Sequence, residues 1–141
     1  MTDAEIESLV KRFEDCTLPE AEWTHAAHLT TALYYLYRLN REQALDKMRA
    51  GIQRYNASLG KFIGYHETIT RAWIAVIANF LATCDRAHPL AVLAAQLVSQ
   101  CADSRYLLQF YSRDCLFSAE ARAAWVPPDL KELPGIFTNR L

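Results

Sequence analysis

The chain has 141 residues, of which 52% are hydrophobic and 22% are charged. This length and balance fit one domain, residues 1–141, that buries a core, and they exclude a disordered chain. The formal net charge of -1 argues against a nucleic-acid-binding protein that depends on bulk positive charge.

The sequence also carries signals about its compartment. The N-terminal MTDAEIESLV has no basic segment followed by an apolar one, so we expect no signal peptide. The most apolar stretch, residues 72–82, has about half of the roughly 20 residues that cross a bilayer. The four cysteines are far apart and form no C-x-x-C pair, which is typical of reduced thiols. We therefore expect a cytoplasmic protein with no membrane partner.

Helix signals recur along the chain, and strand signals are almost absent. Thr2 with Glu5 has the pattern of a capping box, and so does Asn40 with Gln43. Pro89 suits the first turn of a further helix. Together with the hydrophobic periodicity, these signals predict helices over residues 2–15, 24–39, 40–56, 65–83, 89–101, 104–111 and 118–125.

The predicted fold class is all-α. We expect a compact single-domain helical bundle of about five main helices, two short C-terminal helices and an extended tail. Residues 58–64 hold two glycines and predict a break, and the tail VPPDLKELPG holds three prolines. The apolar faces could serve a core or a dimer interface, so a homo-oligomer stays open.

Three of the four histidines are predicted to point inward. On a helical wheel, His25 and His28 share an arc with the leucines of residues 24–39. His66 shares its arc with Trp73 and the aliphatic residues of 65–83. Short connections make successive helices antiparallel, so the second and fourth helices should be parallel. All three imidazoles should then meet at one end of the bundle.

Converging imidazoles could form a metal centre. Neutral imidazole is a common ligand of divalent transition metals, and His25, His28 and His66 could hold zinc, iron or manganese. Glu22 lies one turn before His25 and could act as a ligand, an orienting partner or a catalytic carboxylate. Glu67 could act as a base, although it is also spaced to pair with Arg71.

Polar and aromatic side chains near these histidines and in the last third of the chain could bind a substrate. Trp73 could form the floor of a pocket, and Arg122 could hold a carboxylate or a phosphate beside the histidines. The alternative is an ordinary cap at Ser118 and an ion pair of Arg122 with a carboxylate such as Asp114 or Asp129. The predicted substrate-binding residues are Tyr65, Thr70, Trp73, Arg105, Tyr111, Ser112 and Arg122.

The sequence resembles a family of small bacterial proteins that have no assigned reaction. The elements that carry the resemblance are EWTHAAHL within 18–29, GYHET-T--W at 64–73, YS at 111–112, S--AR at 118–122 and PDL at 128–130. The resemblance covers most of the chain and implies that these elements belong to one module. It implies no substrate and no cofactor.

Two kinds of function remain open. The first is a metal-dependent or histidine acid–base enzyme that acts on a small polar molecule. The second is a non-catalytic module that binds a small ligand or a protein, with the histidines as buried structural groups.

Overall fold

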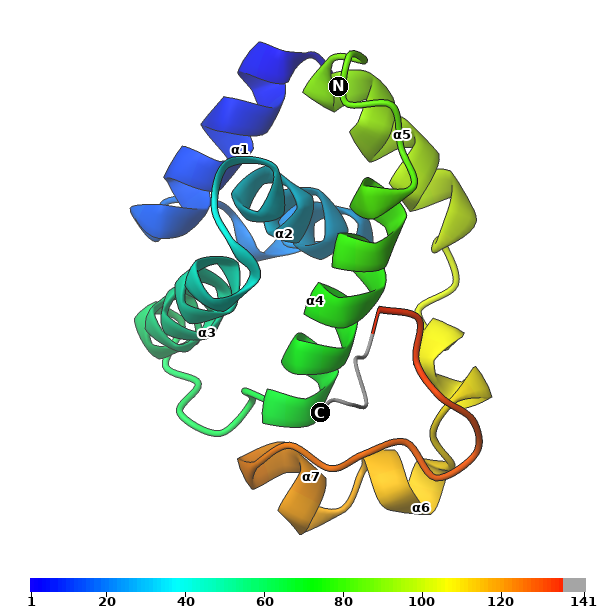
Figure 1. The fold of residues 1–141 in the computed structure, drawn as a ribbon. Coiled ribbons are helices and arrows are strands. Elements are labelled where there is room, and N and C mark those ends of the chain that lie inside the picture. Colours follow the sequence, from blue (N-terminus) through cyan, green and yellow to red (C-terminus); the bar gives the residue numbers. More distant parts are fainter. Residues whose placement is uncertain (136–141) are drawn as a thin grey trace.

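The structure is a computed structural model that describes residues 1–135. Its elements, in chain order (Figure 1), are α1 (Asp3–Glu14), η1 (Glu20–Glu22), α2 (His25–Arg38), α3 (Arg41–Ser58), α4 (Glu67–Ala82), α5 (Leu90–Gln100), η2 (Tyr106–Gln109), α6 (Arg113–Leu116) and α7 (Ala119–Ala123). The elements η1 and η2 are 3-10 helices, and the described residues contain no strand. The predicted all-α class with five main helices is confirmed.

Side-chain caps set most of the helix starts. The capping boxes of Thr2 with Glu5 and of Asn40 with Gln43 both form, as the sequence predicts. Helix α4 begins two residues later than predicted, because the His66 side chain acts as its N-cap. The predicted helix over 104–111 is wrong: only the 3-10 turn η2 forms there, and Ser112 then caps the short α6.

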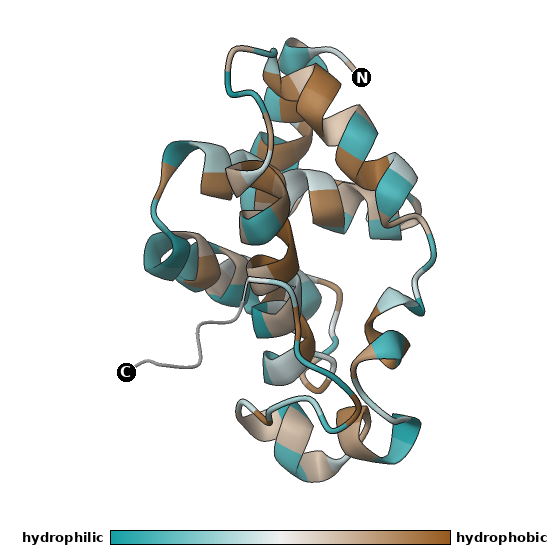
Figure 2. Cartoon of the chain, turned by 45° about the vertical axis from the view of Figure 1, so that its right-hand side comes forward, coloured by the Kyte–Doolittle hydropathy of each residue, from teal (hydrophilic) through white to brown (hydrophobic). Residues whose placement is uncertain are grey.

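Helix α4 lies at the centre of the molecule. It packs against α2, α3, α5 and α7, and its apolar side chains are buried among theirs. In Figure 2, α4 carries mostly hydrophobic colours, whereas α3 at the periphery mixes hydrophilic and hydrophobic ones. A second, smaller cluster joins α1 to α3 around Phe13 and Tyr55. Gly51 allows this approach, since a Cβ there would lie 2.7 Å from the Phe13 ring.

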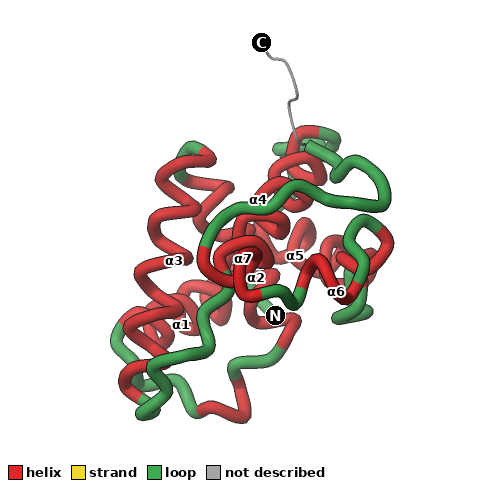
Figure 3. The backbone as a smooth tube through the Cα atoms, turned by 90° about the horizontal axis from the view of Figure 1, so that it is seen from below, coloured by secondary structure: helices red, strands yellow, loops and turns green. Residues whose placement is uncertain are grey.

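The second and fourth helices are not parallel, contrary to the sequence-based expectation. Figures 1 and 3 show that α4 crosses α2 and α3 steeply instead of running alongside them. Ridges-into-grooves packing allows such crossings, and short connections fix only that neighbouring helices touch. Consequently the start of α4 does not lie at the level of the start of α2.

The residues after α7 are extended, as predicted for the proline-rich tail. The backbone N–H of Val126 donates to Thr68 Oγ1 on α4, and the backbone N–H of Leu130 donates to the carbonyl oxygen of Phe110. Leu133 is buried against the main core. Within residues 1–135, no helix combines the length and the apolar character needed to cross a membrane.

Candidate functional site

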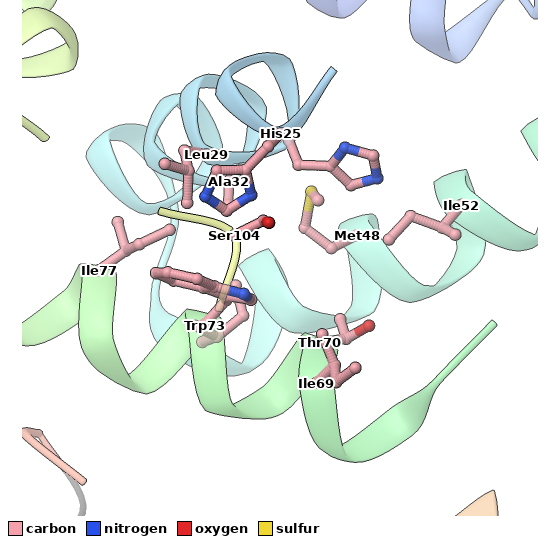
Figure 4. A pocket seen from close by; sticks show the side chains of 12 residues that line it. His25, Leu29, Ala32, Met48, Ile52, Ile69, Thr70, Trp73, Ile77 and Ser104 are labelled. Atoms are coloured by element: carbon pink, nitrogen blue, oxygen red, sulfur yellow. The ribbon is translucent and has the colours of Figure 1, made fainter. Parts of the chain in front are cut away.

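A cavity of about 340 Å³ lies where α2, α3 and α4 meet. This volume is within the range of pockets that hold small molecules. Figure 4 shows the side chains that surround it, with Trp73, Ile69 and Ile77 on α4 facing His25 and Leu29 on α2. The lining residues are His25, His28, Leu29, Ala32, Met48, Ile52, Ile69, Thr70, Trp73, Ile74, Ile77 and Ser104.

The His25 imidazole is held by a backbone carbonyl from another element. Its Nε2 lies 2.8 Å from the carbonyl oxygen of Cys101, the C-cap residue that follows α5. Because a carbonyl oxygen only accepts hydrogen bonds, Nε2 is the donor in this bond, and in the neutral tautomer that carries this proton Nδ1 is the acceptor. The ring meets the Trp73 indole edge to face, with 5.4 Å between centroids.

The His28 imidazole is oriented in the opposite sense. Its Nδ1 lies 2.9 Å from the carbonyl oxygen of Thr24, so Nδ1 carries the proton and Nε2 is the acceptor. Its ring lies over the Trp23 indole at 3.9 Å between centroids. Burial lowers the pKa of His28 below its ordinary value, and His25 adds to this effect. His28 is therefore neutral at pH 7.

His66 does not join this pair, contrary to the sequence-based prediction. Its Nδ1 accepts the backbone N–H of Ile69 at 3.0 Å, and its Nε2 donates to the carbonyl oxygen of Leu116 at 2.6 Å. Burial lowers the pKa of His66, which keeps the ring neutral. With both ring nitrogens engaged, His66 joins the start of α4 to α6 and has no lone pair left for a ligand.

The predicted three-histidine metal site does not form. Residues 1–135 contain no group of three or more His, Cys, Asp or Glu side chains placed to bind a metal ion. The cause is the steep crossing of α2 and α4, which places Thr70 and Trp73, rather than His66, opposite His25 and His28. The residues present do not fit the zinc, iron or manganese centre that the sequence suggested.

Glu67 is a buried, fully partnered carboxylate. Arg49 on α3 binds it with two hydrogen bonds, Nε to Oε1 at 2.9 Å and Nη2 to Oε2 at 2.6 Å. The Tyr65 hydroxyl donates to Oε1 at 2.7 Å, and Arg71 approaches only to 4.0 Å. Arg49 is the main cause that holds the pKa of Glu67 below its ordinary value. Glu67 is ionised at neutral pH and does not line the cavity, so it is not placed to act there as the predicted base.

Four further predicted site residues also lie outside the cavity. Glu22 in η1 forms an exposed ion pair with Arg12, and Arg105 forms one with Asp103. The buried Tyr111 donates to the carbonyl oxygen of Val126 at 2.7 Å. Ser112 caps α6 and donates to Asp129. The contacts of Tyr111 and Ser112 are those of structural groups.

Seven of the twelve predicted site residues gather in two places. The cavity gathers His25, His28, Thr70 and Trp73. A separate surface depression gathers Tyr65, Glu67 and Arg122. Met48 and Ile52 on α3 complete the cavity, and sequence reasoning missed them because apolar helix positions give no sign of which of them border a hollow.

No family model matches the chain, and no curated protein or solved structure is significantly similar to it. The resemblance to the small bacterial family therefore stays a prediction, and the site's own geometry must supply any proposal about function.

Proposed function

We propose that this protein binds a small molecule with a flat apolar body and a hydrogen-bond donor, such as a phenolic hydroxyl. The observation that carries the proposal is the pair of oriented imidazoles, His25 and His28, on the wall of a cavity lined mainly by apolar side chains. Each ring donates to a backbone carbonyl, which leaves Nδ1 of His25 and Nε2 of His28 as acceptors. No described residue donates a hydrogen bond to either of these two nitrogens.

The rest of the cavity supports an apolar ligand body. Trp73 contributes its indole, which is also stacked on Tyr106 at 5.3 Å between centroids and is thereby held in place. Met48, Ile52, Ile69 and Ile77 supply flexible and aliphatic surface. Such a lining, with a few fixed polar groups, is typical of small-molecule pockets.

Phenol and anisole provide the test, because they share an aromatic ring and differ in the O–H donor. We expect phenol to bind about three to tenfold more tightly than anisole, the value of one neutral hydrogen bond. The preference should vanish in the His25→Ala, His28→Ala double variant. Affinities are measured by calorimetry or by NMR titration.

His88→Ala serves as the matched control, because His88 is exposed and lies outside the cavity. It should retain the preference for phenol. Equal affinity for phenol and anisole in the unmodified protein, or a preference that survives the double variant, would contradict the proposal.

The second candidate is a histidine acid–base enzyme that uses the same cavity. It is favoured by the hydrogen bond from His28 Nδ1 to Thr24, because this bond fixes the tautomer whose Nε2 can take a proton. Proton transfer to His28 does not require His66 as a metal ligand, and it does not require the carboxylate of Glu67. Its test is the pH dependence of the rate at which the protein hydrolyses 4-nitrophenyl acetate.

A further inference from the structure

A second hollow lies across the contact between α3 and α4 from the histidine cavity. Met48 and Ile52 of α3 border the cavity, whereas their chain neighbours Arg49 and Gln53 border this surface depression of about 630 Å³. Its other walls are residues 62–65 before α4, Glu67 and Arg71 on α4, and residues 122–125 at the end of α7. Four separate parts of the chain therefore meet around it.

The lining of this depression is strongly positive. Three guanidinium groups, from Arg49, Arg71 and Arg122, border it, and Glu67 is the one carboxylate among its described lining residues. The lining therefore carries a net charge of +2, from three positive groups and one negative group. Arg49 and Glu67 bind each other, and Asp46, which lies outside the lining, also contacts Arg49.

Arg71 and Arg122 make no ion pair shorter than 4.0 Å with a carboxylate of the described residues, and the Glu67 that Arg71 approaches also binds Arg49. Arg71 comes no nearer than 4.0 Å to Glu67, and its guanidinium lies over the Trp125 ring at 5.2 Å from the centroid. Arg122 directs Nη1 at the carbonyl oxygens of Gly64 and Tyr65, at 3.4 and 3.3 Å. Both side chains retain N–H donors for an anion.

Apolar side chains stand at the edge of the same depression. Phe62 is 81% exposed and Ile63 is 93% exposed, the highest values among the large hydrophobic residues of the described chain. Both belong to the depression's lining, as does Trp125. The guanidinium groups of Arg71 and Arg122 lie beside exposed apolar side chains. Such a surface complements a ligand that has an anionic end and an apolar body.

From these observations we infer that the depression is a binding site for a phosphate monoester with an apolar substituent. An arginine guanidinium can donate two parallel hydrogen bonds to the oxygens of either a phosphate or a carboxylate. A phosphate monoester carries a charge of about -1.5 to -2 at pH 7, which balances the lining better than the single charge of a carboxylate. This site is independent of the function proposed for the histidine cavity.

The experiment titrates the whole protein with phenyl phosphate, inorganic phosphate and benzoate, and follows binding by calorimetry. Phenyl phosphate should bind most tightly, inorganic phosphate more weakly for lack of the apolar contact, and benzoate weakest. Arg71→Gln and Arg122→Gln should each weaken phenyl phosphate at least about tenfold, the value of a hydrogen bond to a charged group. Circular dichroism verifies that both exposed-residue variants are folded.

Arg113→Gln is the matched control, because Arg113 is exposed on α6 and does not line the depression. It removes one positive charge and should leave phenyl phosphate affinity within about twofold at 0.15 M salt, where distant charges are screened. Three results would overturn the inference. The first is no binding of phenyl phosphate at about 10 mM. The others are equal losses of affinity in all three variants, and benzoate binding as tightly as phenyl phosphate.

Discussion

At the scale of single residues, three inward histidines turn out to have two different roles. His66 uses both ring nitrogens in backbone hydrogen bonds, whereas His25 and His28 each use one. This difference cannot be read from a helical wheel, which gives the direction of a side chain but not its partners. Among these three histidines, only His25 and His28, which line the cavity, have a ring nitrogen left to bind a ligand or to take a proton.

The acid–base candidate makes a specific prediction for His28. Hydrolysis of 4-nitrophenyl acetate should depend on neutral His28, which takes a proton from the attacking water. Because burial lowers the pKa of His28, the rate should stay high below pH 6.5 and fall only as pH drops through the lowered pKa. The His28→Ala variant should lose this pH-dependent part of the rate, and the His88→Ala variant should keep it. An unchanged pH–rate profile in His28→Ala would exclude His28 as the base.

At the scale of secondary-structure elements, His66 joins the start of α4 to the end of α6. His66→Ala removes the α4 cap and leaves the Leu116 carbonyl without its donor, so it should lower the free energy of unfolding by about 2 kcal/mol. His66→Asn keeps a good capping side chain and should cost about half as much. Urea denaturation measures both values. A loss below about 0.5 kcal/mol in His66→Ala would show that these bonds contribute little.

The stability should also depend on pH through the same residue. The pKa of His66 is lowered in the folded state, so the unfolded chain binds the proton more readily. The contribution of His66 to the free energy of unfolding is therefore complete above about pH 6.5, the ordinary pKa of histidine. This contribution is lost as the pH falls through the lowered pKa of the folded state. In His66→Asn this part of the pH dependence should disappear, while the part due to His28 remains. An identical pH dependence in His66→Asn would contradict this account.

Much of the fold could be predicted at this scale, because its signals are local. The two capping boxes and the apolar periodicity identify five main helices to within about two residues at most ends.

The site was harder to predict, because it depends on how α2 and α4 cross. Trp73 and Thr70, predicted as inward residues of the fourth helix, line the cavity with His25 and His28. Arg49 was missed as the partner of Glu67, since no spacing rule connects residues 18 positions apart on different helices.

At the scale of the whole molecule, the centrally placed α4 separates two hollows of different character. One is mainly apolar and carries the imidazoles of His25 and His28, and the other is positive and edged by exposed apolar groups. Both use neighbouring positions of the same two helices, α3 and α4. The Arg49–Glu67 ion pair spans these helices and so helps to fix the wall between the two hollows.

We propose that His25 and His28 each present one fixed acceptor nitrogen to a ligand. The most direct test is ¹⁵N NMR of the imidazole rings at pH 8 during a titration with phenol. We predict that His25 is protonated on Nε2 and His28 on Nδ1, and that the resonances of His25 Nδ1 and His28 Nε2 move as phenol binds, while those of His66 and His88 stay unchanged. The opposite tautomers, or phenol-dependent shifts confined to His66 or His88, would show that His25 and His28 do not accept the hydrogen bond of the ligand.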